Sequence, residues 1–352
     1  MSIFYVILAI LFFGLLIIVH ELGHFTAAKA FGVRVEEFAV GMGPVLFSRE
    51  RGETTYSLRA VPFGGFCAMA GEDEALDDVR AFTSQKPWKR AIILCAGSFM
   101  NFVTGLLIVL VLYSGAAAFR APIITDFMEG CPYQGEDAFQ KGDRIHSIDG
   151  KRIYQYADVT DFLSQGDGTH DIVVKRDGKK VRIDDMHLVP VEYPGESRKM
   201  YGFYFGYEVA TPTVIIRNAW DTTMEFGRWV GMGLQELVRG NVGVEDMSGP
   251  VGIVGMMAET GESAETTSDA LYSIFYLGAF IAVNLALMNM LPIPALDGGR
   301  VFLLLVTMLI EALTKKKLDP KYEGYIHAAG MVLLLALMAF VMFNDIIRIV
   351  MK

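Results

Sequence analysis

The stretch that decides the fold is LFFGLLIIVHELGHFTAAKA, residues 11–30, in which two histidines and a glutamate directly follow an apolar run. The run itself extends without interruption from residue 3 to residue 19. At about 1.5 Å per residue it is roughly 25 Å long as a helix, slightly less than the ~30 Å of bilayer hydrocarbon. His20 and His24 are thus expected just inside the membrane, where ionisable side chains are costly and usually functional.

Three further runs have the length and composition of membrane spans. Residues 91–119 contain no charged side chain, and the segments at roughly 271–293 and 327–343 are long enough to cross the hydrocarbon. The whole chain is 53% hydrophobic and only 20% charged, which is unlike an ordinary soluble protein. The first run lacks the basic start and the small-residue cleavage site of a signal peptide, so we expect it to be retained. We predict a polytopic α-helical membrane protein with about four transmembrane helices.

The distribution of charge predicts an orientation in the membrane. Lysine and arginine are concentrated between the first two spans and between the last two, whereas residues 120–270 are rich in acidic side chains. By the positive-inside rule, both basic segments are cytosolic, and both termini with the acidic region face outward. The formal net charge of −9 argues against a nucleic-acid partner. Three widely spaced cysteines indicate neither a disulfide framework nor a thiolate zinc site.

The first cytosolic segment has the pattern of a β-hairpin beside the membrane, within a first domain at residues 1–119. Its stretch VGMGPVLFSRERGETTYSLRAVPFGGFCAMAGE is rich in β-branched and aromatic residues, with a turn at Arg51-Gly52. Gly64-Gly65 permits close approach of another backbone. The free edge of such a hairpin can accept a substrate peptide as an added strand, although a purely structural ribbon would have the same pattern.

Residues 120–195 have the pattern of a small α+β domain. We expect a strand, a turn at Asp149-Gly150, a helix from about Ala157 to Ser164 and a hairpin turned at Asp177-Gly178. The region resembles a bacterial PDZ domain, because residues 141–145, KGDRI, match the Gly-Asp-x-Ile stretch of that family. The resemblance, together with the charge distribution, implies one extracytoplasmic PDZ-like domain.

The remainder of the chain is assigned to a linker and a last membrane pair. Residues 196–270 form the linker, in which 214–239 is an amphipathic helix lying at the interface or against protein. Residues 271–352 hold the last two spans, separated by 301–310, a run too short to cross the bilayer.

The residues HELGH at 20–24 have the spacing of a zinc-binding helix. His20 and His24 are one helical turn apart on one face and can bind a single metal ion, and Glu21 beside them can act on a metal-bound water. The alternative is a pair of interfacial histidines with a glutamate that reaches toward the headgroups. Neutral imidazole ligands to a zinc ion would offset the cost of placing these groups at membrane depth.

A third protein ligand is expected, because catalytic zinc sites usually have three plus water. With four spans, the C-terminal ends of the first and third lie on the same side. The third is followed by NMLPIPALDGG, in which Pro292 and Pro294 end the helix and Asp297 follows at the depth of the histidines. Without the first motif, Asp297 would be taken for an ordinary Asp-Gly turn. The side-chain amide of Asn289 could hold an unwound substrate segment.

These motifs together resemble the site-2 proteases, and among them the group of the bacterial regulator of sigma-E protease, RseP. The resemblance rests on HELGH in a first span, Asn289 to Gly298 as N-x-x-P-x-P-x-L-D-G, and Gly41-x-Gly43-Pro44. It implies an intramembrane zinc metalloprotease, in which the equivalents of His20, His24 and Asp297 bind Zn²⁺, that of Glu21 is the catalytic base and that of Asn289 handles substrate. One departure is Gly97-Ser98, where the family has Gly-Pro before x-x-Asn-Phe.

The resemblance also implies the class of substrate and the location. Substrates in the family are single-span membrane proteins already trimmed outside, such as anti-sigma factors, or remnant signal peptides, and the enzyme lies in the bacterial inner membrane. A catalytically inactive membrane receptor or chaperone, whose PDZ-like domain binds protein tails, is the alternative. A metal transporter would need more polar residues in its spans than Asn101, Asn284 and Asn289. The roles of Asn101 and of SGPVGIV, residues 248–254, do not follow from the sequence.

Overall fold

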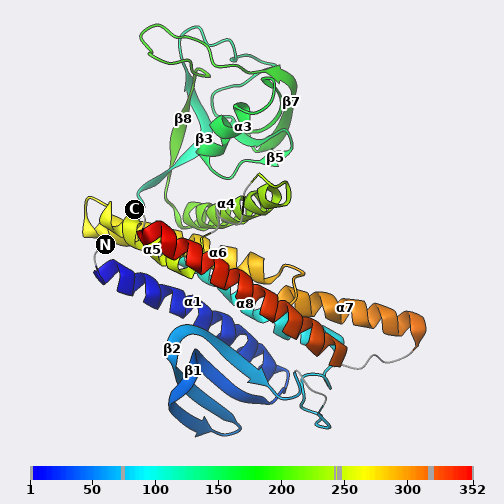
Figure 1. Ribbon diagram of the computed structural model, residues 1–352. Helices are drawn as coiled ribbons and strands as arrows, with labels where there is room; N and C mark the ends of the chain where they lie inside the picture. The colour runs from blue at the N-terminus through cyan, green and yellow to red at the C-terminus, as the bar shows by residue number, and fades with distance from the viewer. Residues whose placement is uncertain (1–2, 73–75, 242, 244–247, 316–320, 351–352) are drawn as a thin grey trace. The chain divides into compact units, whose positions relative to one another are not determined.

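The computed structural model describes residues 3–72, 76–241, 243, 248–315 and 321–350 (Figure 1). The chain divides into two compact units, one formed by Met1–Ile108 with Phe226–Lys352 and the other by Val109–Glu225. The first unit holds the apolar helices and a small sheet, and the second holds a larger sheet.

Four helices among the described residues are long and apolar enough to cross a membrane, as the sequence predicts. They are α1 (Ile3–Ala30), α2 (Pro87–Tyr113), α6 (Thr267–Asn289) and α8 (Lys321–Val350). A lipid-exposed backbone must satisfy its hydrogen bonds within the segment, and for these single stretches a helix does so. The helix α7 (Asp297–Thr314) is not among the candidate spans, in agreement with the prediction for residues 301–310.

The packing of α1 positions the HELGH motif. The helix continues through the motif to Ala30, so His20, Glu21 and His24 lie on its C-terminal half. Its N-terminal half packs against α6 and α5 (Pro250–Glu262) through a buried cluster that includes Phe12, Leu16, Met257, Ile274 and Ala282. The C-terminal half packs against α2 and the small sheet through a second cluster that includes Ala28, Val35, Phe38, Cys67 and Ile93.

The stretch SGPVGIV begins α5, and its backbone binds the last helix. The amide groups of Gly249 and Gly252 donate hydrogen bonds of 3.0 and 2.9 Å to Oδ2 of Asp345, a buried residue of α8. A Cβ atom at Gly252 would lie 2.8 Å from Asp345 Oδ1, so glycine is required for this approach. The first amide groups of a helix have no partner within the helix, and a carboxylate is well suited to accept from them. The stretch therefore joins α5 to α8.

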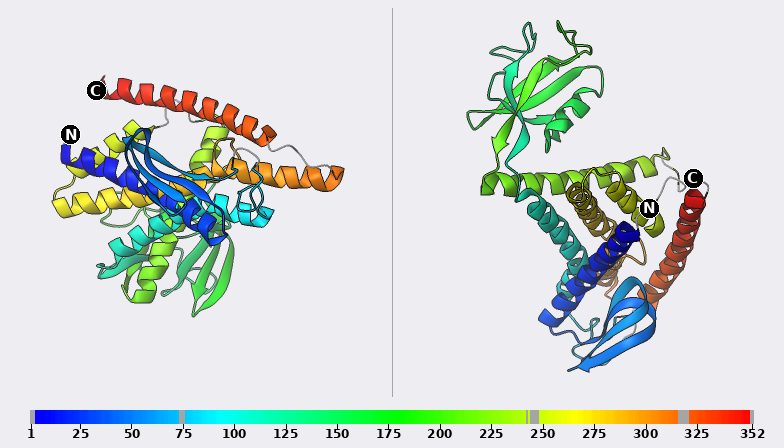
Figure 2. Two further views of the ribbon diagram at one scale, coloured as in Figure 1. Left: turned by 90° about the horizontal axis from the view of Figure 1, so that it is seen from below. Right: turned by 90° about the vertical axis from the view of Figure 1, so that its left-hand side faces the viewer.

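The small sheet consists of β1 (Val35–Arg51) and β2 (Thr54–Met69), joined at the expected turn, where Gly52 has φ of 67°. Both strands are irregular, and residues 37–40 of β1 pair with 65–68 of β2 on one side and with 55–58 on the other. The segment at 45–51 pairs in turn with 54–59. The predicted hairpin is thus curled into four short rows, in the order 65–69, 35–40, 54–59 and 45–51, and it lies against α1 (Figure 2).

The second unit contains a six-stranded sheet with the order β7-β6-β4-β3-β8, and β5 paired to β4. The strands are β3 (Ala118–Phe127), β4 (Arg144–Ile148), β5 (Lys151–Arg152), β6 (Thr169–Arg176), β7 (Lys179–His187) and β8 (Phe203–Val209). The expected helix is α3 (Tyr156–Leu163), and both expected Asp-Gly turns are present with positive φ at each residue, as in type I′ hairpins. The helix and the two Asp-Gly turns that the sequence predicts for this unit are therefore confirmed.

Three elements lie within residues 196–270, which the sequence assigns to a linker: β8, α4 and the helix α5 described above. The strand β8 pairs with β3, and its alternating aromatic residues Phe203 and Phe205 pack on the core of the sheet. The amphipathic helix α4 (Pro212–Val238) covers the predicted range 214–239. Two acidic side chains of this helix are buried, since Asp221 and Glu225 are 6% and 5% exposed. Burial raises the pKa of the Asp221 carboxyl, against the opposing effect of Arg152, Arg217 and other cations.

Candidate active site

The two histidines of HELGH face each other across one turn of α1. Their rings are nearly perpendicular with centroids 4.8 Å apart, and the two Nε2 atoms are 3.3 Å apart. His24 is buried, with 7% of its surface exposed. Because the helix has 3.6 residues per turn, side chains four residues apart meet in this way.

Both imidazoles are contacted through Nδ1 by α2. Nδ1 of His24 is 2.8 Å from the carbonyl oxygen of Ile93, so Nδ1–H donates and Nε2 has a free lone pair. Nδ1 of His20 is 3.4 Å from the side-chain nitrogen of Asn101. The side-chain oxygen of Asn101 is buried without a hydrogen-bond partner. If the amide is turned so that its oxygen and nitrogen exchange places, this oxygen accepts a hydrogen bond from His20 Nδ1–H. In that arrangement both Nε2 atoms offer lone pairs toward the same point.

Asp297 reaches the histidines through the loop after α6. The helix ends at Asn289, Pro292 and Pro294 prevent its continuation, and α7 begins at Asp297 itself. Close packing of the loop requires Gly298 and Gly299, since a Cβ at either would lie within about 2.2 Å of backbone atoms of residues 290–293. Oδ2 of Asp297 lies 3.1 Å from His20 Nε2 and 3.3 Å from His24 Nε2.

These three side chains fit a divalent metal ion. Their potential ligand atoms all lie within 4.8 Å of one another, and no other such cluster is found in the described part of the chain. Asp297 Oδ2 is buried and has no hydrogen-bond partner among the described residues, although it faces two imidazole nitrogens. Atoms that present lone pairs to one another repel unless a cation lies between them. Two histidines and a carboxylate are a ligand set that zinc uses in catalytic sites, with a fourth position left for water or substrate.

A family model described as Peptidase family M50 matches residues 8–337 of the chain. The chain belongs to peptidase family M50. The resemblance to the site-2 proteases, the members of this family, is therefore confirmed. This M50 chain is 35% identical to a Clostridium perfringens protein named "Putative zinc metalloprotease", over 348 residues that cover 97% of this chain and 98% of the relative.

Two Bacillus proteins are similar over the same extent. The M50 chain is 27% identical to the regulator of sigma-W protease RasP of Bacillus subtilis, over 430 aligned positions covering 98% of each chain. The zinc metalloprotease RasP of Bacillus licheniformis is also 27% identical, with 98% of this chain and 99% of the relative covered. The chain is accordingly a zinc metalloprotease.

In this M50 protease a small pocket opens beside the histidines. It has a volume of about 230 Å³ and is lined by Ile17, His20, Glu21, Gly64, Gly65, Asn101, Leu285 and Asn289. Glu21 and Asn289, which the sequence singled out as base and substrate-handling residue, thus lie in one cavity with His20. The side-chain nitrogen of Asn289 is 3.4 Å from His20 Nε2. All five candidate site residues are brought together, from positions about 270 residues apart.

Two glycines permit the helices of this site to approach. A Cβ at Gly23, within HELGH, would lie 2.4 Å from the carbonyl oxygen of Ala96 on α2. A Cβ at Gly97 would lie 2.3 Å from His24 Nε2 and 2.8 Å from His20 Cε1. Small residues at such crossings let backbones come close in membrane proteins. In the sequence, Gly97 stands out only as part of a departure from the family pattern, and α2 runs through Gly97-Ser98 without interruption.

Proposed function

We propose that this M50 zinc metalloprotease hydrolyses peptide bonds within or near the transmembrane segments of single-span membrane proteins. The observation that carries the proposal is the convergence of His20, His24 and Asp297 on one point between apolar helices. A protease site at this depth is suited to segments that lie in the membrane, since ionisable groups are costly there unless they have a function.

In this proposal each site residue has one role. His20, His24 and Asp297 would hold Zn²⁺, which would polarise the scissile carbonyl and lower the pKa of water enough for it to be deprotonated at neutral pH. Glu21, in the same pocket, takes the proton from the attacking water and passes it to the nitrogen of the leaving amine. Asn289 holds the substrate backbone through its side-chain amide.

The edge of the small sheet is proposed to present the substrate. A transmembrane helix makes all its backbone hydrogen bonds internally, so a substrate must unwind before its carbonyl reaches the site. Gly64 and Gly65 line the same pocket as Glu21, and the row at 65–69 is an outer row of the sheet. A Cβ at Gly65 would lie 3.3 Å from Glu21 Cγ, so glycine leaves room for an extended peptide there. An unwound segment added to this row would pass the pocket.

The second unit is proposed to be an extracytoplasmic PDZ-like domain that limits substrate size. The positive-inside distribution of lysine and arginine supports both termini and this unit outside, with the site near the cytosolic face of a bacterial inner membrane. Substrates would be single-span proteins already trimmed outside, such as anti-sigma factors, or remnant signal peptides. Deleting residues 122–190 should allow untrimmed substrates to be cut, and unchanged substrate choice in that deletion would contradict the filter.

The central test measures zinc and cleavage separately. The full chain, purified in detergent, is assayed for bound zinc and for cleavage of a membrane-embedded reporter. We expect Glu21→Gln to keep zinc and lose cleavage, because only the proton acceptor is removed. Asp297→Asn should lose both, because a neutral amide is a weaker ligand than a carboxylate. Cleavage by Glu21→Gln at the wild-type rate would refute the mechanism, and wild-type protein that contains no near-stoichiometric zinc would favour an inactive receptor or chaperone.

A further inference from the structure

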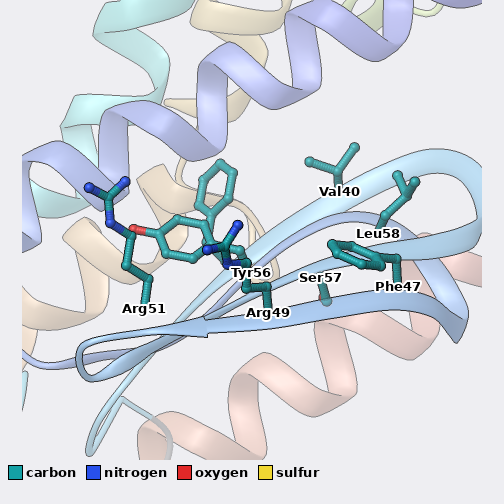
Figure 3. Close-up of a pocket in the computed structure, with 8 residues that line it drawn as sticks. Val40, Phe47, Arg49, Arg51, Tyr56, Ser57 and Leu58 are labelled. Atoms are coloured by element: carbon teal, nitrogen blue, oxygen red, sulfur yellow. The ribbon is translucent and has the colours of Figure 1, made fainter.

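The face of the small sheet that is turned toward α1 forms a groove of about 860 Å³, in which the Phe38 and Tyr56 rings contact Phe25 of α1. The groove lies beside the active-site pocket, because its Val40 is the cross-strand partner of Gly65, which lines that pocket. Its lining is arranged in two cross-strand rows, Phe38–Tyr56–Arg49 and Val40–Leu58–Phe47, followed by Arg51. In Figure 3 the two arginines lie with Tyr56 at one end of the groove, and Val40, Leu58 and Phe47 lie together at the other. The groove therefore has a cationic end and an apolar end.

Contacts with α1 orient this groove along the helix axis. The turn that follows Arg51 lies at the C-terminal end of α1, because Lys29 Nζ is 2.7 Å from Glu53 Oε1. The opposite end of the sheet lies along the middle of the helix, since a Cβ at Gly65 would contact Ile17 and Glu21. From Glu21 to Lys29 the axis rises roughly 12 Å. The cationic end is thus the end nearer the membrane surface.

The deeper end exposes an unusual amount of apolar surface. Leu46 and Phe47 are 67% and 63% exposed, and Met42, Val45 and Val61 are each about half exposed. Soluble proteins rarely leave such a group uncovered, and clustered exposed apolar side chains indicate contact with lipid or a partner. Beside the middle of a transmembrane helix, the available apolar material is hydrocarbon.

The two arginines of the groove have no ion-pair partner in the described part of the chain, whereas Arg59 on the same sheet has one. Arg59 Nη2 is 2.7 Å from Glu37 Oε1. Burial would raise the pKa of the Glu37 carboxyl, but hydrogen bonds from Ser57 and Arg59 hold it below its usual value. Arg49 and Arg51 therefore keep their charge available to an external anion.

We propose that this groove binds an anionic phospholipid, with the phosphate between Arg49 and Arg51 and an acyl chain along Tyr56, Leu58 and Phe47. The polarity of the groove matches that of a lipid in the leaflet at the C-terminal end of α1, with charge at the surface and hydrocarbon toward the bilayer centre. Guanidinium groups bind phosphate oxygens in pairs, and cationic side chains at a membrane surface favour anionic lipids. A transmembrane peptide would match the apolar end and leave both arginines without an anion. The inference uses none of the residues assigned to catalysis.

The test compares lipids that differ only in the headgroup. The full chain carrying Glu21→Gln, which removes turnover, is purified in neutral detergent and titrated with phosphatidylglycerol or phosphatidylcholine of identical acyl chains, with bound lipid counted by native mass spectrometry. We expect phosphatidylglycerol to bind about 30-fold more tightly, given the effect of two cations at a lipid surface. Arg49→Gln with Arg51→Gln should abolish this preference. Phe47→Ser should weaken both lipids equally.

A matched control removes the same charge elsewhere. Lys179→Gln with Lys180→Gln takes two exposed cations from β7 and should leave the preference intact. Equal retention of both lipids by the wild-type groove, as expected if it holds only acyl chains or a transmembrane peptide, would overturn the proposal. So would loss of the preference in the lysine control. Glycerol phosphate that binds as tightly as phosphatidylglycerol would make this a soluble-anion site instead and would also overturn it.

Discussion

Replacing Gly97 by alanine adds one methyl group at the point where α2 meets the two histidines. The new Cβ would lie 2.3 Å from His24 Nε2, whereas ordinary contacts are about 3.5 Å, so one partner must move by roughly 1 Å. The imidazole cannot turn away freely, because it is buried and its Nδ1 is 2.8 Å from the Ile93 carbonyl. If α2 moves instead, that hydrogen bond lengthens. Either response displaces a nitrogen that we assign to zinc.

The expected cost follows from the narrow tolerance of zinc coordination. Zn–N distances are about 2.0–2.1 Å and vary by only about 0.2 Å, so a shift near 1 Å removes the ligand. Loss of a residue that merely orients a ligand lowers metal affinity by about 10- to 100-fold. For Gly97→Ala we expect zinc affinity to fall by at least about 100-fold, which is roughly 3 kcal/mol of binding free energy.

The assay is competition for zinc with a chelator of known affinity, using protein in detergent. Gly105→Ala is the matched control, because it adds a methyl group to the same helix, 2.8 Å from Val283 Cγ2 and away from the site. The control should lower the thermal midpoint by disturbing the packing of α2 on α6, and it should keep zinc affinity. Gly97→Ala with zinc affinity within about threefold of wild type would refute the reasoning, as would an equal loss of zinc in the control.

Three further predictions concern other polar groups. Asn101→Leu should lower zinc affinity about tenfold by removing the amide beside His20 Nδ1, and unchanged affinity in the same competition would contradict that role. Asp345→Ala should lower the free energy of unfolding by about 3 kcal/mol through loss of two charge-assisted hydrogen bonds, read as a lower thermal midpoint, and an unshifted midpoint would exclude it. Burial, with nearby cations, lowers the pKa of His146 in the folded protein to about 4. As pH falls from about 6.5 toward 4, His146 is therefore protonated in the unfolded chain before it is protonated in the folded protein, and the free energy of unfolding decreases. His146→Gln should reduce the difference in thermal midpoint between pH 7 and pH 5, whereas His187→Gln should leave that difference unchanged. An equal difference in the wild type and both variants would contradict the role of His146.

The candidate site was predictable from sequence because its parts obey simple geometry. Apolar runs fix which segments can cross a bilayer, and the helical period places His20 and His24 on one face. Counting spans then puts Asp297 on the same side as the histidines, without any knowledge of packing. The Asp-Gly turns of the second unit were predictable for a similar reason, since few residues other than glycine tolerate the positive φ that tight hairpins need.

What the sequence did not predict depends on contacts between distant elements. The hairpin at 35–69 was expected, yet its curling into four rows depends on register, which the alternation of side chains does not specify in glycine-rich strands. Gly97 and Ile93 have no local motif, and their importance follows only from the crossing of α1 and α2. The strand β8 was assigned to a linker because the element it pairs with, β3, precedes it by some 80 residues.

Two aspartates associated with the apolar helices show how structure separates a structural carboxylate from a candidate metal ligand. Asp297 and Asp345 each follow or end an apolar stretch, and only the motif around Asp297 and its side of the membrane single it out in the sequence. In the fold, Asp345 accepts two backbone hydrogen bonds from the start of α5, so its negative charge is satisfied by the protein itself. Oδ2 of Asp297 is equally enclosed, faces two imidazole nitrogens and has no hydrogen-bond partner among the described residues. Leaving a buried acceptor unpaired costs about 1–3 kcal/mol, and more for a charged group. Because M50 proteins are zinc metalloproteases, a bound zinc ion is the partner that would offset this cost at Asp297, whereas Asp345 needs none.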